Sequence, residues 1–145
     1  MSSESAGTAR LSWHEPEVIR RLVTGARTIA VVGASPGPAR PSHGVARYLH
    51  AAGLRIFPVN PSIDTLFGLR AYPSLSDVPE PIDIVDVFRR PEHATGIARE
   101  AVRIKAGALW LQLGVVSEQA ARIAAEGGLG VVMDRCLAIE HRRLA

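Results

Sequence analysis

Five short apolar runs are spread along the chain, and stretches with helical periodicity lie before, between and after them. The apolar runs span 29–33, 54–59, 82–88, 108–113 and 129–133, and their lengths are typical of strands. Apolar residues three or four positions apart predict helices over 13–23, 42–52, 91–106, 117–125 and 137–143. The segments 63–69 and 72–79 are predicted connections, the second with one helical turn.

This alternation predicts the fold. Strands that alternate with helices form right-handed βαβ crossovers and a mainly parallel sheet. The strands are apolar throughout, as expected when helices cover both faces. No linker or repeat divides the chain, so we predict one doubly wound α/β domain over 13–145 with a mainly parallel five-stranded sheet. Residues 1–12 are rich in Ser, Ala and Gly and are predicted to form a flexible tail.

The stretch Thr28–Leu49 joins a buried strand, a turn rich in glycine and proline, and a helix whose predicted N-cap is Ser42. This arrangement places free backbone N–H groups and the positive end of a helix dipole at one spot, which suits a phosphate. Ligands of doubly wound sheets lie at the carboxyl ends of the strands, beside the switch in strand order. We therefore expect a phosphorylated, nucleotide-type ligand beside the turn that begins at Gly33.

The charge of the chain suits an anionic ligand but does not favour a nucleic-acid partner. There are 17 Lys and Arg against 14 Asp and Glu, and no run of four basic residues occurs. The densest cluster, Glu140–Arg143, fits a solvated helix end. Cys136 is the single cysteine, which fits a cytoplasmic protein, and no apolar run approaches the roughly 20 residues that span a membrane. The histidines have no metal-binding spacing, so no metal site is expected.

Two features argue against an NAD-type site. The turn reads Gly33-Ala34-Ser35-Pro36-Gly37-Pro38, which lacks the G-x-G-x-x-G spacing. The second strand ends in Asn60, where a dinucleotide site has an acidic residue that binds a ribose hydroxyl. An NAD(P)- or nucleotide-sugar-dependent enzyme with an atypical phosphate turn stays the alternative. Its acid–base group would have to be His43, Asp134 or Cys136.

Several motifs together carry a family resemblance. They are Val32-Gly33-Ala34-Ser35, Arg40-Pro41-Ser42-x-Gly44-Val45, Pro58-Val59-Asn60-Pro61, Asp86-Val87-Phe88-Arg89-Arg90-Pro91-Glu92, Trp110-Leu111-Gln112-Leu113-Gly114-Val115 and Met133-Asp134-Arg135-Cys136. In this order, from about Arg20 to Leu144, the chain resembles the CoA-binding domain family. Members of that family are stand-alone proteins similar to the N-terminal domain of the succinyl-CoA synthetase α subunit.

The resemblance implies a Rossmann-like domain that binds coenzyme A, free or as an acyl-CoA, in a binding or regulatory role without catalysis. Carried over by position, the residues that would contact coenzyme A are Gly33, Ala34, Ser35, Arg40, Ser42, Val59, Asn60, Pro61, Phe88, Arg89, Gln112 and Gly114. The first five would contact phosphates, the next three would line the adenosine side, and the last two would lie near the pantetheine. Synthetase chemistry is not expected, because no counterpart of the synthetase's phosphorylated histidine occurs. Assembly as a homodimer stays open.

Three residues have a second interpretation that the sequence leaves open. Asn60 precedes Pro61 and fits turn chemistry as well as a ligand contact. Cys136 follows the fifth strand and is interpreted either as a small buried side chain or as a thiol near that of coenzyme A. Arg89, together with Arg90, flanks a predicted helix start, where a cation is unfavourable, and this mismatch favours an anionic partner for one of the two.

Overall fold

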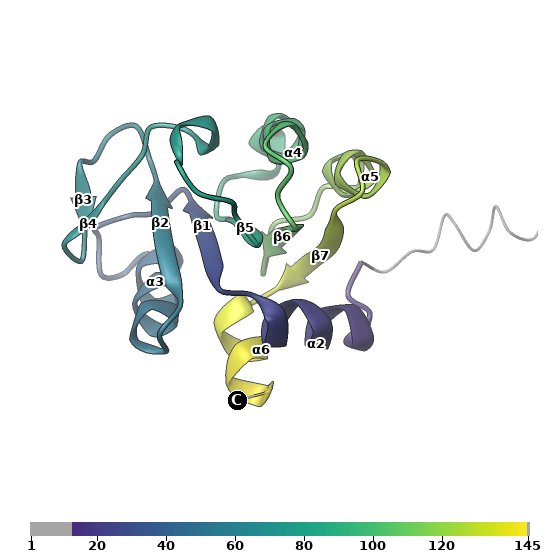
Figure 1. Cartoon of the computed structure of the whole chain (residues 1–145), viewed down its shortest axis with the longest axis horizontal. Coiled ribbons are helices and arrows are strands. Elements are labelled where there is room, and N and C mark those ends of the chain that lie inside the picture. The colour runs from purple at the N-terminus through teal and green to yellow at the C-terminus, as the bar shows by residue number, and fades with distance from the viewer. Residues whose placement is uncertain (1–12, 145) are drawn as a thin grey trace, which may run out of the picture.

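The computed structural model describes residues 13–144, which form a five-stranded sheet covered by helices on both faces (Figure 1). The strands are β1 (Thr28–Val32), β2 (Arg55–Val59), β5 (Ile84–Val87), β6 (Ala108–Gln112) and β7 (Gly130–Arg135). Their order in the sheet is β2-β1-β5-β6-β7, and every neighbouring pair is parallel. The predicted doubly wound α/β fold is therefore confirmed. The predicted tail over 1–12 lies outside the described residues.

The helices form one layer on each face of the sheet (Figure 1). They are α2 (Pro16–Gly25), α3 (Pro41–Ala51), α4 (Ala94–Arg103), α5 (Glu118–Glu126) and α6 (Leu137–Leu144). The pair α4 and α5 packs on one face through small buried alanines, while α2, α3 and α6 cover the other. The side chains of β6 alternate between the two cores, Leu109 and Leu111 in one, Ala108 and Trp110 in the other. Burial on both faces explains why most strand residues are apolar, with Asp86 in β5 and Gln112 in β6 as buried polar exceptions.

The helix starts differ from the prediction. The helix α3 begins at Pro41 with Arg40 in the N-cap position, so the prediction that Ser42 caps it was wrong. Likewise, α2 begins at Pro16 and not at Trp13. In both cases proline occupies the first helical position, because its fixed φ suits a helix and its missing N–H would have had no partner there.

The predicted connection 63–69 folds into a small hairpin of β3 (Thr65–Leu66) and β4 (Leu69–Arg70). Its two turn residues, Phe67 and Gly68, both have positive φ, as a tight two-residue hairpin turn requires. The helical turn predicted within 72–79 is present as η1 (Leu75–Asp77), and a second such turn, η2 (Pro91–His93), precedes α4.

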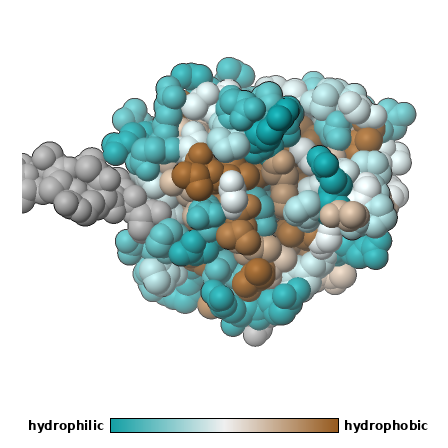
Figure 2. Space-filling model, turned by 180° about the vertical axis from the view of Figure 1, so that it is seen from behind, coloured by the Kyte–Doolittle hydropathy of each residue, from teal (hydrophilic) through white to brown (hydrophobic). Residues whose placement is uncertain are grey.

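The strand order reverses between β1 and β5. After β1 the chain moves to β2 at one edge, and from β5 onward it moves towards the opposite edge. The connections that leave β1 and β5 therefore diverge, which opens a crevice at the carboxyl ends of these strands. On the face seen in Figure 2, hydrophobic side chains gather in the middle and hydrophilic ones surround them. None of the helices within 13–144 is long and apolar enough to span a membrane.

Candidate ligand-binding groove

Two adjoining cavities lie at the carboxyl ends of the parallel strands. The first cavity, of about 620 Å³, is bordered by the turns after β1, β2 and β5 and by α4. The second cavity, of about 570 Å³, lies between α3 and α6 beside the end of β6. Gly33, Arg40 and Phe88 line both cavities, so the two form one groove across the switch point.

Gly33 fixes the turn that separates the strand β1 from the groove. Its φ is +90°, and a Cβ there would lie 3.1 Å from Cδ of Arg89 and 3.2 Å from the carbonyl oxygen of Phe88. Its N–H donates to the carbonyl of Val59 at 2.9 Å. The turn after β1 is thus held against the ends of both neighbouring strands, and only glycine fits this close approach without strain.

The rest of the turn is held by short-range hydrogen bonds. The N–H of Gly37 donates to Oγ of Ser35 at 3.1 Å, and the carbonyl of Ser35 lies 3.1 Å from Nδ1 of the buried His43. The other ring nitrogen of His43 lies 3.2 Å from the guanidinium of Arg47. Because a guanidinium only donates, Nε2 of His43 accepts, and the Nδ1 proton is donated to Ser35.

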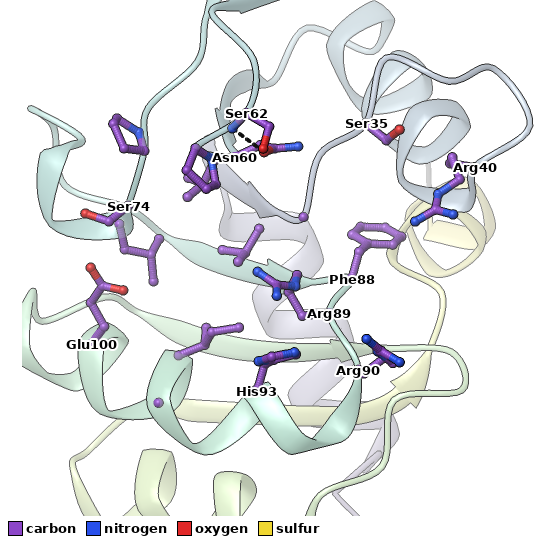
Figure 3. A pocket seen from close by; sticks show the side chains of 18 residues that line it. Ser35, Arg40, Asn60, Ser62, Ser74, Phe88, Arg89, Arg90, His93 and Glu100 are labelled. Atoms are coloured by element: carbon purple, nitrogen blue, oxygen red, sulfur yellow. Dashed lines mark hydrogen bonds between the residues drawn. The ribbon is translucent and has the colours of Figure 1, made fainter.

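Asn60 joins the turns that follow β1 and β2. Its Nδ2 donates to the carbonyl of Ala34 at 2.7 Å. Its Oδ1 accepts from the N–H of Ser62 at 2.7 Å, as Figure 3 shows. An aspartate here would place a carboxylate against the Ala34 carbonyl and would have no proton to donate. The absence of an acidic residue at this strand end therefore has a structural reason.

Positively charged side chains reach the first cavity from two sides (Figure 3). Arg40 lies at the start of α3, while Arg89 and Arg90 follow β5. Within the described part of the chain, neither Arg40 nor Arg89 has an ion-pair partner, and Arg90 lies 3.7 Å from Glu92. Together with the α3 N-terminus, these arginines make this stretch of the groove attractive to an anion.

A carboxylate stands at the far end of the first cavity. Glu100, on α4, lies there (Figure 3). It accepts hydrogen bonds from the N–H of Ser76 at 2.9 Å and from its hydroxyl at 2.8 Å. The cavity is therefore polarised along its length, with arginines near β1 and β5 and an acceptor group near α4. Within residues 13–144, no three His, Cys, Asp or Glu side chains are grouped so that they could hold a metal ion.

The second cavity has a different lining. Its polar groups are largely engaged: Tyr48 Oη lies 2.8 Å from Nδ1 of His141, and Gln112 Oε1 accepts from the N–H of Leu137 at 3.3 Å. The guanidinium of Arg142 lies 4.8 Å from the centre of the Tyr48 ring. The remaining wall is mostly apolar and is contributed by Val45, Leu113, Val115, Ala138 and Ile139, with Cys136 half-buried beside them.

The groove brings most of the predicted site residues together. Those that line the first cavity, the second or both are Gly33, Ser35, Arg40, Ser42, Val59, Asn60, Pro61, Phe88, Arg89 and Gln112. Ala34 and Gly114 line neither cavity. Ala34 is fully buried and contributes its carbonyl to Asn60, whereas the N–H of Gly114 donates to Oδ1 of Asp134 at 2.8 Å.

Sequence reasoning missed several lining residues. Glu100, His93, Tyr48, Ile139 and Arg142 lie on helices, and only the packing of those helices brings them to the groove. The basic end of α6 was interpreted as a solvated helix end, and no local pattern marks Arg142 as a cavity residue. A signal was available only for the arginine pair after β5, where a cation precedes a helix start.

Asp86 is fully buried in β5, two residues before Phe88, which lines the groove. It pairs with Val31 and Trp110 in the sheet. Neither carboxylate oxygen has a hydrogen-bond partner among the described residues. Burial raises the pKa of the Asp86 carboxyl well above its ordinary value. Asp83, by contrast, accepts from the N–H groups of Arg27 and Thr28 at 2.7 and 3.1 Å, which is a structural role.

The fold and the groove define a doubly wound α/β protein with an open crevice at its switch point. The CoA binding domain family matches residues 27–142, and the chain belongs to this family. The predicted resemblance is confirmed.

Among the relatives, YneT of Bacillus subtilis, described as an uncharacterized protein, is 42% identical over 123 residues, which is 85% of this chain and 91% of YneT. A hypothetical protein from Pyrococcus horikoshii has a similar structure, with a TM-score of 0.88 and 36% identity over 92% of this chain and 94% of that one. The dinucleotide forming acetyl-coenzyme A synthetase 1 of Ca. Korarchaeum cryptofilum is similar with a TM-score of 0.66 and 26% identity. That similarity covers 71% of this chain but 25% of the synthetase, so this chain resembles one part of a larger enzyme.

Proposed function

We propose that this protein binds coenzyme A along the groove, with the nucleotide in the first cavity and the pantetheine arm directed towards the second. One observation carries the proposal: Arg40 and Arg89 come from different parts of the chain, lack ion-pair partners within 13–144, and both line the first cavity, with Arg40 at the α3 N-terminus. A diphosphate supplies the negative charge that this arrangement attracts. Membership of the CoA binding domain family supports the same ligand.

The contrast between the two cavities fits the two ends of coenzyme A. Its phosphorylated nucleotide is strongly anionic, and the first cavity carries the arginines and the polar groups of Ser35 and Asn60. Its pantetheine arm is uncharged, and the second cavity has a mostly apolar lining. A dinucleotide such as NAD has a ribose and a charged ring at its second end, and neither suits an apolar cavity.

Isothermal titration tests the ligand directly. Coenzyme A is expected to bind, and NAD⁺ and NADP⁺ are expected to bind far more weakly. Arg40→Ala and Arg89→Ala should each weaken coenzyme A binding by about tenfold or more, since a hydrogen bond to a charged group contributes about 1.5–3 kcal/mol. Arg99→Ala is the matched control, because Arg99 is an exposed arginine on α4 that lines neither cavity. Tighter binding of NAD⁺ than of coenzyme A would refute the proposal.

We propose that binding occurs without catalysis. The acid–base candidates have structural partners: His43 uses both ring nitrogens, and Asp134 accepts from the N–H of Gly114. Cys136 remains, half-buried at the second cavity. Prolonged incubation with acetyl-CoA, followed by chromatography, should show no thioester cleavage above the rate without protein. Cleavage that Cys136→Ser abolishes would contradict this part of the proposal.

The proposal includes a cytoplasmic location, supported by the single cysteine of the sequence. Light scattering with and without coenzyme A would measure the molar mass and show whether the protein forms a homodimer. A shift in mass on adding the ligand would place the groove at or near a subunit contact.

A further inference from the structure

The second cavity is more than a passage for an uncharged linker, because its walls expose apolar side chains to water. Leu113 is 61% exposed and Ile139 is 40% exposed, and both line this cavity. Val45 and Val115 complete the apolar wall from α3 and from the segment after β6. Large exposed apolar side chains at a concave surface mark a site that a partly apolar ligand covers.

The groove connects this apolar wall to the phosphate turn. Gly33, Arg40 and Phe88 belong to both cavities, so a ligand whose diphosphate lies beside Arg40 has its other end directed at the space between α3 and α6. In coenzyme A that other end carries the thiol, and in an acyl-CoA it carries the acyl group. The acyl group is thus the part of such a ligand that reaches the apolar wall.

The charges around the second cavity further restrict which acyl group it can hold. Among residues 13–144, no Asp or Glu lines it, so these residues offer an amino-acyl cation no counter-ion there. Arg142 is the one cation on the α6 side, and its guanidinium is stacked over the ring of Tyr48. The side-chain oxygen of Gln112 and the hydroxyl of Tyr48 already have partners in Leu137 and His141. These features disfavour a cationic acyl group, and the apolar wall favours an apolar one.

We propose that the second cavity holds the acyl group of an acyl-CoA and that the protein selects short apolar acyl thioesters over free coenzyme A. The inference rests on the proposed coenzyme A binding, which it deepens by naming the ligand class. Each acyl methylene that becomes fully buried raises the affinity about fourfold, so the preference grows with chain length until the cavity is filled.

Titrations with coenzyme A, acetyl-CoA, butyryl-CoA and succinyl-CoA test this inference. We expect butyryl-CoA to bind about tenfold more tightly than acetyl-CoA, acetyl-CoA to bind more tightly than coenzyme A, and succinyl-CoA to bind more weakly than butyryl-CoA. Equal affinities for coenzyme A and butyryl-CoA would overturn the inference and leave the proposed function standing. Succinyl-CoA binding as tightly as butyryl-CoA would also overturn it, because Arg142 would then bind the succinyl carboxylate. If neither coenzyme A nor any thioester binds, the inference and the proposed function both fail.

A pair of variants on α6 tests whether the acyl group lies in the second cavity. Ile139→Asn should remove most of the gain of butyryl-CoA over coenzyme A, measured as the ratio of the two affinities in the same variant. Leu144→Asn is the matched control, because Leu144 lies on the same helix with 39% exposure and does not line the second cavity. Both substitutions are neutral and at exposed positions, and unchanged melting temperatures would show that the fold is intact. Loss of the butyryl-CoA gain in both variants would overturn the placement of the acyl group.

Discussion

Replacing Gly33 by alanine tests the turn on which the groove is built. Gly33 has a φ of +90°, where an L side chain costs about 1–2 kcal/mol. The new Cβ would also lie 3.2–3.3 Å from the carbonyl oxygen and carbon of Phe88, which are backbone atoms at the end of β5. Crowding a packed site costs about 1–3 kcal/mol more. We therefore expect Gly33→Ala to lower the free energy of unfolding by roughly 2–5 kcal/mol.

Thermal unfolding followed by circular dichroism measures this loss. For a domain of this size, 1 kcal/mol corresponds to about 2–4 °C, so the melting temperature should fall by roughly 4–20 °C. Gly25→Ala is the control, because Gly25 has no positive φ and a Cβ there would meet nothing within 4 Å. If the two variants unfold at the same temperature, the reasoning about close approach at Gly33 is refuted. At a temperature where the variant is folded, its affinity for coenzyme A should also fall, since the turn carries Ser35 and Arg40.

Three further substitutions test other parts of the structure by urea unfolding. Asp86→Asn should abolish one pH dependence of the stability. Because burial raises the pKa of the Asp86 carboxyl, its contribution to the wild-type stability is largest below the ordinary pKa and declines as the pH rises through the raised value. Equal slopes for the two proteins between pH 4 and 9 would contradict this. Ser117→Ala should cost about 1 kcal/mol, because Ser117 Oγ accepts from the N–H of Ala120 at the start of α5; an unchanged midpoint would mean that water replaces the cap. Asn60→Asp should cost about 1–3 kcal/mol, because the carbonyl of Ala34 loses its donor; a variant as stable as the wild type would show that this hydrogen bond contributes nothing.

The sheet was predictable because each strand carries its own signal. A parallel strand covered on both faces is apolar at every position, and the helices between the strands have clear periodicity. The ends of β1, β2 and β5 were therefore placed to within a residue or two, and with them the turns that line the first cavity. Cap chemistry was a weaker guide, since Pro41 and Pro16 began the helices where a Ser or an apolar pattern predicted another start.

The second cavity was only partly predictable, because its lining depends on how α3 and α6 meet. The two helices are separated by most of the chain, and nothing near Tyr48 or Arg142 in sequence records that they are in contact. Gln112 was found from the end of β6, but Ile139 was not, because an apolar residue on an amphipathic helix has the same local pattern whether it faces a core or a groove.

The loop 34–40 has a clearer role once the two cavities are seen together. The N–H of Arg40 donates to the carbonyl of Gly37, and the N–H of Gly37 donates to Oγ of Ser35, so the loop folds back on itself before α3 begins. Arg40 is thereby held at the wall that the first and second cavities share. A cation at this boundary would fix where the anionic part of a ligand ends and its uncharged part begins. We expect a lengthened loop to shift Arg40, and with it this boundary, relative to α6.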